Sequence, residues 1–194
     1  HWLKVHQIPL GAKTARGRAI INLLNLEKEE KVAAFVNVRE FDDERYVVMA
    51  TRQGIVKKTT LSAYGNPRRG GINAITIREN DDLLAAELTD GSHEIMLASS
   101  GGKAIRFHES EVRDMGRTAS GVKGITLPTD QYAVGMIVVR ETDSVLVVTA
   151  TGLGKRSLVS DYTLQHRGGQ GVRTVKTTDK TGNLVTMKRV TDEE

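Results

Sequence analysis

The feature of this 194-residue sequence that most constrains its fold is an internal repeat of about 50 residues. A glycine opens a short run that leads, six positions later, to an aliphatic residue, and copies begin at 17, 71, 121 and 171. The last copy reaches Thr177 instead but keeps Val172 and Val175. A fixed period of this length is typical of solenoids, propellers and arrays, in which each copy packs against its neighbours.

Two further landmarks keep the same period and the same order. The first is an apolar run followed by a glycine turn and a strand with basic residues, found at 47–58, 95–106 and 146–156. The second is an aliphatic run, found at 32–36, 83–86, 134–138 and 184–185. Lys4 precedes Lys58 by about one repeat, so we expect the sequence to open inside an earlier copy.

Each unit contains about four short runs rich in Val, Ile, Leu and Thr, bounded by the turn residues Gly, Asp, Asn and Ser. Helical periodicity is not sustained anywhere. Four strands in each repeat of this length match a propeller blade, whereas solenoid repeats are shorter and less rich in strands. We predict one all-β, propeller-like domain over 1–194, with units at about 1–15 (partial), 16–66, 67–116, 117–166 and 167–194 (partial).

The number of units indicates an incomplete disc. Radial folds of this kind close with four to eight blades. Three nearly complete units with partial ones at both ends therefore predict a part of a longer disc, or an open arc.

The composition excludes several classes of protein. Hydrophobic residues make up 39% of the chain, and no apolar run is long enough to span a membrane. The first residues contain no apolar signal-peptide core. Cysteine is absent, which removes disulfides and thiolate metal sites and fits a reducing compartment. We expect a cytoplasmic protein with no membrane partner.

The basic residues recur at two phases of the repeat, although 28 Lys and Arg barely exceed 24 Asp and Glu. On the strand after the glycine turn they are Lys57, Lys58, Lys103, Arg106, Lys155 and Arg156. Around the opening glycine they include Arg68, Arg69, Lys123, Arg167 and Arg173. Because equivalent positions of a repeat face equivalent directions, these bases predict a stripe around the rim that suits the phosphates of duplex DNA. The alternative is that they are solvated edge-strand charges that prevent aggregation.

One glycine- and arginine-rich loop points the same way. It consists of Gln165, His166, Arg167, Gly168, Gly169, Gln170 and Gly171. Glycine amides can approach phosphates closely, and an arginine fork can bind a phosphate through two hydrogen bonds. Residues 67–71 form a shorter version. A tight loop between units is the alternative explanation.

Nothing in the sequence predicts catalysis or metal binding within this chain. The five histidines show no metal-ligand spacing, and the aspartate pairs fall in turns. A propeller enzyme would need carboxylates converging on a central pocket, and no such set is recognisable.

Four stretches, 4–9, 15–24, 49–59 and 113–125, resemble the C-terminal DNA-wrapping domain of the DNA gyrase A subunit, in family order. The resemblance implies a β-pinwheel, a disc of four-stranded blades that exchange strands, here in a partial set of about four. It also implies that duplex DNA bends around the basic rim. The parent enzyme would be an ATP-hydrolysing type IIA topoisomerase that introduces negative supercoils. Its ATP and Mg²⁺ would be used elsewhere in a heterotetramer with the remainder of gyrase A and the gyrase B subunit.

The sequence departs from that family at its signature heptapeptide, Gln-Arg-Arg-Gly-Gly-Arg/Lys-Gly. His166 and Gln170 replace two basic residues in the closest segment, which resembles a degenerate copy from a later blade. We expect the intact box to lie upstream of His1. The alternatives are the corresponding C-terminal domain of topoisomerase IV and a propeller-type protein–protein scaffold.

Overall fold

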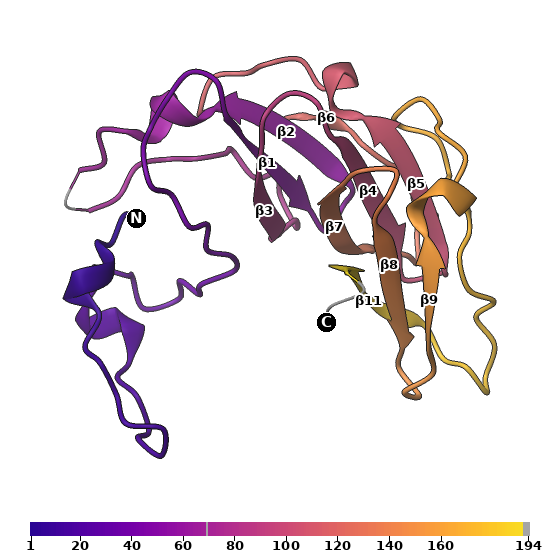
Figure 1. Cartoon of the computed structure of the whole chain (residues 1–194), viewed down its shortest axis with the longest axis horizontal. Coiled ribbons are helices and arrows are strands. Elements are labelled where there is room, and N and C mark those ends of the chain that lie inside the picture. Colours follow the sequence, from indigo (N-terminus) through magenta and orange to yellow (C-terminus); the bar gives the residue numbers. More distant parts are fainter. Residues whose placement is uncertain (69, 192–194) are drawn as a thin grey trace.

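Three antiparallel β-sheets stand side by side in an arc in the computed structural model, which describes residues 1–68 and 70–191 (Figure 1). The first sheet has the strand order β3-β1-β2-β6. Its members are β1 (Tyr46–Thr51), β2 (Ile55–Thr60), β3 (Leu83–Thr89) and β6 (Val122–Lys123). We call this sheet blade 1. Its centre is the β1–β2 hairpin, in which Val48 faces Lys58 across the ladder.

Blades 2 and 3 repeat this plan. Blade 2 has the order β10-β5-β4-β7 and blade 3 the order β11-β8-β9. The strands of blade 2 are β4 (Glu94–Ser99), β5 (Lys103–His108), β7 (Ala133–Val139) and β10 (Val172–Arg173). Those of blade 3 are β8 (Ser144–Thr149), β9 (Gly154–Leu158) and β11 (Leu184–Val190). The inner strands β3, β7 and β11 line the concave side of the arc (Figure 1).

Neighbouring repeats exchange strands. The outermost strand of blade 1, β6, follows the hairpin of blade 2 along the chain, and the outermost strand of blade 2, β10, follows the hairpin of blade 3. Equivalent hydrogen bonds secure both exchanges. The carbonyl of Gly54 accepts the N–H of Gly124 at 2.8 Å, and the carbonyl of Gly102 accepts the N–H of Thr174 at 2.9 Å. The predicted all-β pinwheel is confirmed.

Apolar side chains fill the space between neighbouring blades rather than one isolated core. Val48 and Val56 of blade 1 pack with Ile95, Ile105 and Phe107 of blade 2 in one buried cluster. A second cluster joins blades 2 and 3 in the same way. Because burial of apolar area drives folding, each blade depends on the next for its stability.

Short 3₁₀ turns mark the end of each hairpin. They are η3 (Leu61–Tyr64), η4 (Glu109–Glu111) and η5 (Val159–Asp161), and two more, η1 (Val5–Gln7) and η2 (Ile20–Asn22), lie near the start of the chain. Among the described residues, no helix has the length and apolar character needed to span a membrane.

Residues 1–45 contain no β-strand, although the aliphatic run at 32–36 predicts one. In the three blades the equivalent run pairs with the first strand of a hairpin. None of the described residues offers such a partner to 32–36, and Phe35 is 92% exposed. The repeat therefore predicts the apolar run correctly but not its pairing.

Gly171→Ala tests the close approach that strand exchange requires. Gly171 has φ +73°, and a Cβ there would lie 2.4 Å from the carbonyl oxygen of Ala104 on β5. Gly152, with φ +85°, has open space around the same position and is the matched control. Both substitutions strain the backbone by about 1–2 kcal/mol, but only Gly171→Ala adds overpacking of about 1–3 kcal/mol. Chemical denaturation should show this difference, and equal losses would contradict the packing.

Candidate nucleic-acid interface

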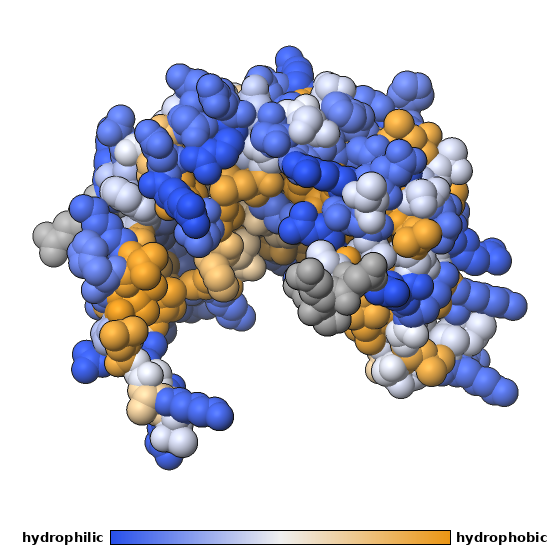
Figure 2. All heavy atoms as spheres, in the orientation of Figure 1, coloured by the Kyte–Doolittle hydropathy of each residue, from blue (hydrophilic) through white to orange (hydrophobic). Residues whose placement is uncertain are grey.

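Exposed cations lie at the outer edge of each of the three blades. Lys123 is exposed on β6 of blade 1. In blade 2, Arg173 of β10 faces the half-buried Lys103 of β5 across the ladder. In blade 3, Lys155 and Arg156 are exposed on β9. Hydrophilic side chains predominate on the convex side of the arc, with some apolar ones among them, and apolar side chains also show on its concave side (Figure 2).

A further predicted base lies in the loop after η3. Arg68 is exposed there, and Arg69 lies outside the described residues. The edge therefore presents five exposed or half-exposed cations from the predicted set, and Arg68 lies apart from it in a loop. The five are Lys103, Lys123, Lys155, Arg156 and Arg173.

The expectation of an exposed stripe is wrong for Lys57, Lys58 and Arg106, whose exposures are 0%, 6% and 4%. The crossing segment of the next repeat covers these positions on β2 and β5. Lys57 donates to the carbonyl oxygens of Ala74, at 2.5 Å, and Arg117. Burial lowers the pKa of the Lys57 ammonium to about 8, and the nearby Arg117 guanidinium acts in the same direction.

The other two buried cations pair with acids that the sequence pattern does not single out. Glu94 binds the Arg106 guanidinium through two hydrogen bonds of 2.5 and 2.9 Å, and this pairing raises the pKa of Arg106. The fully buried Glu109 places Oε2 3.8 Å from Nζ of Lys58. The only signal in the sequence is an acid near each end of the β4–β5 hairpin, which turn chemistry also explains.

The loop at 165–171 folds against the preceding repeat. The N–H of Gly168 donates to the carbonyl of Gly124 at 2.7 Å. Arg167 donates from Nε to the carbonyl of Glu111 at 2.9 Å and from Nη1 to that of Lys123 at 3.0 Å. Two of the three guanidinium nitrogens of Arg167, which was expected to bind phosphate, are therefore engaged within the protein. These bonds favour the explanation that the segment is a tight loop between units.

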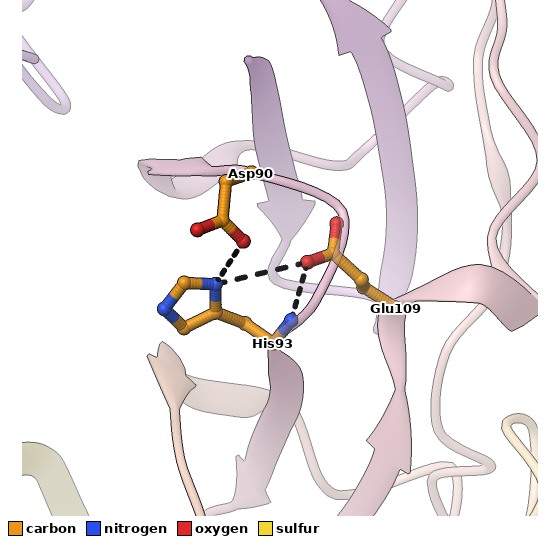
Figure 3. A group of neighbouring side chains, drawn as sticks. All are labelled: Asp90, His93 and Glu109. Carbon is orange, nitrogen blue, oxygen red and sulfur yellow. Dashed lines mark hydrogen bonds and ion pairs between the residues drawn. The ribbon is translucent and has the colours of Figure 1, made fainter. Parts of the chain in front are cut away.

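Three potential metal ligands converge at the turn between β3 and β4 (Figure 3). Nδ1 of His93 lies 2.8 Å from Oδ1 of Asp90 and 4.0 Å from Oε1 of Glu109. Glu109 follows the whole β4–β5 hairpin, so the spacing of the sequence did not predict this cluster.

Hydrogen bonds already engage the ligand atoms of this cluster. Asp90 accepts from the N–H and hydroxyl of Ser92, which with His93 lower its pKa to about 2. Nε of Arg140 donates to Nε2 of His93 at 3.2 Å, and Nδ1 of His93 lies 2.8 Å from Oδ1 of Asp90. Because Arg140 and Lys58 also place positive charge beside the cluster, we interpret it as a structural turn. That the chain binds no metal or cofactor remains a prediction.

The concave side contains a cavity of about 310 Å³ between the inner strands and residues 35–37. Glu87 lies in its wall, accepts the N–H of Val138 at 2.9 Å, and has its pKa raised by burial. Among the described lining residues Glu87 is the one carboxylate. The cavity therefore does not present the paired carboxylates that a propeller enzyme would need.

The fold and its charged edge define a class of protein, a propeller-like array of strand-exchanged blades with cations along the convex side. A family profile described as "DNA gyrase C-terminal domain, beta-propeller" matches residues 2–39, 45–90, 93–140 and 143–191. The chain belongs to this DNA gyrase C-terminal domain family.

Two full-length relatives agree with this family membership. The chain is 44% identical over 192 residues to the DNA gyrase A subunit of Salmonella typhimurium (strain LT2), covering 99% of this chain and 22% of that protein. It is 40% identical over 195 residues to the DNA gyrase A subunit of Staphylococcus aureus (strain NCTC 8325), with the same coverages. The chain therefore spans about a fifth of the length of these relatives.

Two solved structures share the fold. The C-terminal domain of DNA topoisomerase IV aligns with a TM-score of 0.86 and 27% identity, over 97% of this chain and 59% of that one. A DNA gyrase A C-terminal domain aligns with a TM-score of 0.81 and 24% identity, over 94% of this chain and 61% of that one.

The buried ammonium of Lys57 predicts a pH dependence of stability. Its pKa is about 8 in the folded chain, against an ordinary value of 10.5. Between these pH values the unfolded chain holds the proton more tightly, so the free energy of unfolding should rise with pH. Denaturant titrations of the wild type and Lys57→Met measure this contribution as the difference between their pH profiles. Parallel profiles from pH 8 to 10.5 would contradict it.

Proposed function

We propose that this chain is a non-catalytic module of a DNA gyrase A subunit that binds duplex DNA and wraps it around its convex edge. The observation that carries the proposal is the placement of exposed cations at the outer edge of all three blades. The edge strands lie along one curved side, so a polymer of evenly spaced phosphates can contact each blade in turn (Figure 1). Membership of the gyrase family supports the same function.

The physical task of the module is to offset the cost of bending. Bending 20–30 bp smoothly through 40–90° costs on the order of 1–6 kcal/mol. Phosphate contacts carry little base information, so any sequence preference should be weak and arise from the deformability of the DNA.

The module acts within a larger enzyme in this proposal. Wrapping presents a DNA segment to the strand-passage gate, so that ATP-driven passage introduces negative supercoils. The partners are the remainder of gyrase A and the gyrase B subunit in a cytoplasmic heterotetramer, and ATP and Mg²⁺ are used in those other parts.

The corresponding domain of topoisomerase IV is a second candidate, because a solved domain of that enzyme aligns over 97% of this chain. A parent sequence with an intact heptapeptide box would favour gyrase. A protein–protein scaffold is a third candidate, and it predicts no retardation of DNA at low salt.

The exposed edge predicts a steep salt dependence of binding. If the five edge cations each neutralise one phosphate, log K should fall with log salt at a slope of about −4.5. Replacing Lys123 and Arg173 with glutamine should make the slope shallower by about 2, with equal losses on unrelated DNA sequences. The matched control replaces Lys28 and Lys31, which are exposed outside the blades, and should retain the slope. A wild-type slope near zero would contradict the proposal.

Wrapping itself is tested by DNA topology. Relaxed circles are incubated with the chain and topoisomerase I at a salt concentration where binding is established. The proposal predicts a shift in linking number that grows with the amount of bound protein. Bound protein that traps no writhe would reject wrapping.

A further inference from the structure

Two buried cations occupy equivalent positions at successive joints between blades. A joint here is the place where the crossing segment of the next repeat pairs with the second strand of a hairpin. Lys58 on β2 and Arg106 on β5 are about one repeat apart and lie where the next repeat crosses over the blade. The carbonyl of Lys58 accepts the N–H of Met115 at 2.9 Å, and that of Arg106 accepts the N–H of Gln165 at 2.9 Å. The same backbone joint is therefore built twice, with a different cation in each copy.

Arg106 connects blade 2 to the turn that follows the hairpin of blade 3. Its Nη1 donates to the carbonyl oxygens of Val159, at 3.2 Å, and Tyr162, at 2.9 Å, both at turn η5. Its Nε and Nη2 bind Glu94 of its own blade, and Nη2 lies 3.6 Å from Glu141. Because the guanidinium is planar, its two sets of partners are held at a fixed mutual orientation.

Lys58 makes looser contacts at the joint between blades 1 and 2. Its Nζ donates to the carbonyl of Glu109 at 3.3 Å and lies 3.5 Å from Oδ1 of Asp114. The ammonium also lies 4.8 Å from the centre of the Tyr46 ring. A point charge on a flexible stem restrains orientation less than a guanidinium fork does.

We infer that Arg106 is a positioning residue that fixes the angle between blades 2 and 3, and thereby the path of DNA along the convex edge. The inference rests on the proposed wrapping function. Its guanidinium is buried and contacts carbonyls and carboxylates of the protein, whereas the edge cations proposed to contact phosphates are exposed or half-exposed. The writhe trapped per bound domain then depends on Arg106, while the number of phosphate contacts does not.

The competing possibility is that Arg106 contacts a phosphate directly. Loss of a phosphate contact weakens binding on all sequences and makes the salt slope shallower by about 1. Loss of an angular restraint leaves the slope unchanged but alters the linking-number shift per bound domain. The two roles therefore give opposite patterns in two measurements.

The experiment compares Arg106→Gln and Glu94→Gln with the control Lys155→Gln, on the exposed outer edge of blade 3. Glu94→Gln breaks the same fork while removing a negative charge, so a purely electrostatic effect on DNA would raise affinity. Circular dichroism establishes that each variant is folded, and if Arg106→Gln is not, Glu94→Gln and Arg106→Lys carry the test. We call Arg106→Gln and Glu94→Gln the joint variants, and we expect them to keep the wild-type salt slope and to change the linking-number shift per bound domain at least twofold. Lys155→Gln should instead make the salt slope shallower by about 1 and leave the linking-number shift per bound domain unchanged.

A second readout does not depend on DNA. The chain has no cysteine, so spin labels can be attached at Asp130→Cys before β7 and Lys180→Cys before β11, two exposed equivalent turns of blades 2 and 3. The distance distribution between the labels should broaden or shift in the joint variants and remain unchanged in Lys155→Gln.

Each outcome assigns failure to one claim. An unchanged distance distribution in the joint variants overturns the inference, as does a shallower salt slope with an unchanged linking-number shift. A wild-type domain that binds DNA without trapping writhe overturns the proposed function. In that case the label distances alone decide whether Arg106 fixes the joint.

Discussion

The arrangement of the blades depends on how the outer edge of the second hairpin strand, β2 in blade 1 and β5 in blade 2, is covered. An exposed edge presents unpaired N–H and C=O groups and invites aggregation. In blades 1 and 2 this edge is covered by two residues of a later repeat, and a positive-φ glycine lets the covering chain approach it. At Gly121 a Cβ would lie 2.6 Å from the carbonyl oxygen of Val56. Blades 1 and 2 are thus each completed by a later repeat, which holds successive blades side by side in an arc.

The same exchange sorts the basic residues into two roles. Where the crossing segment covers a hairpin, Lys57 and Arg106 become buried and bind carbonyls of the joint, and Arg106 also binds the carboxylate of Glu94. Bases on the covering strands, such as Lys123 and Arg173, remain exposed. One repeated sequence pattern therefore supplies both the angular restraints and the charged edge, and the edge follows the curvature that the joints impose.

The repeat allowed the fold to be predicted because hydrophobic period, turn residues and copy length all agree on a blade. It could not separate buried from exposed bases. Lys58 and Arg156 occupy the same phase of the pattern, yet Lys58 pairs with Asp114 of the crossing segment, and no described strand pairs with the outer side of β9. Exposure thus depends on a partner segment that lies more than one repeat further along the chain. The cluster of Asp90, His93 and Glu109 was missed for the same reason, because its members meet only through tertiary structure.

The central claim is that the edge cations hold a curved double helix. Energy transfer between dyes at the two ends of a duplex of about 30 bp measures that curvature directly when the domain is bound. The account predicts that transfer rises in proportion to occupancy and returns to the free value when salt releases the protein. Saturated binding with the transfer of straight DNA would contradict it.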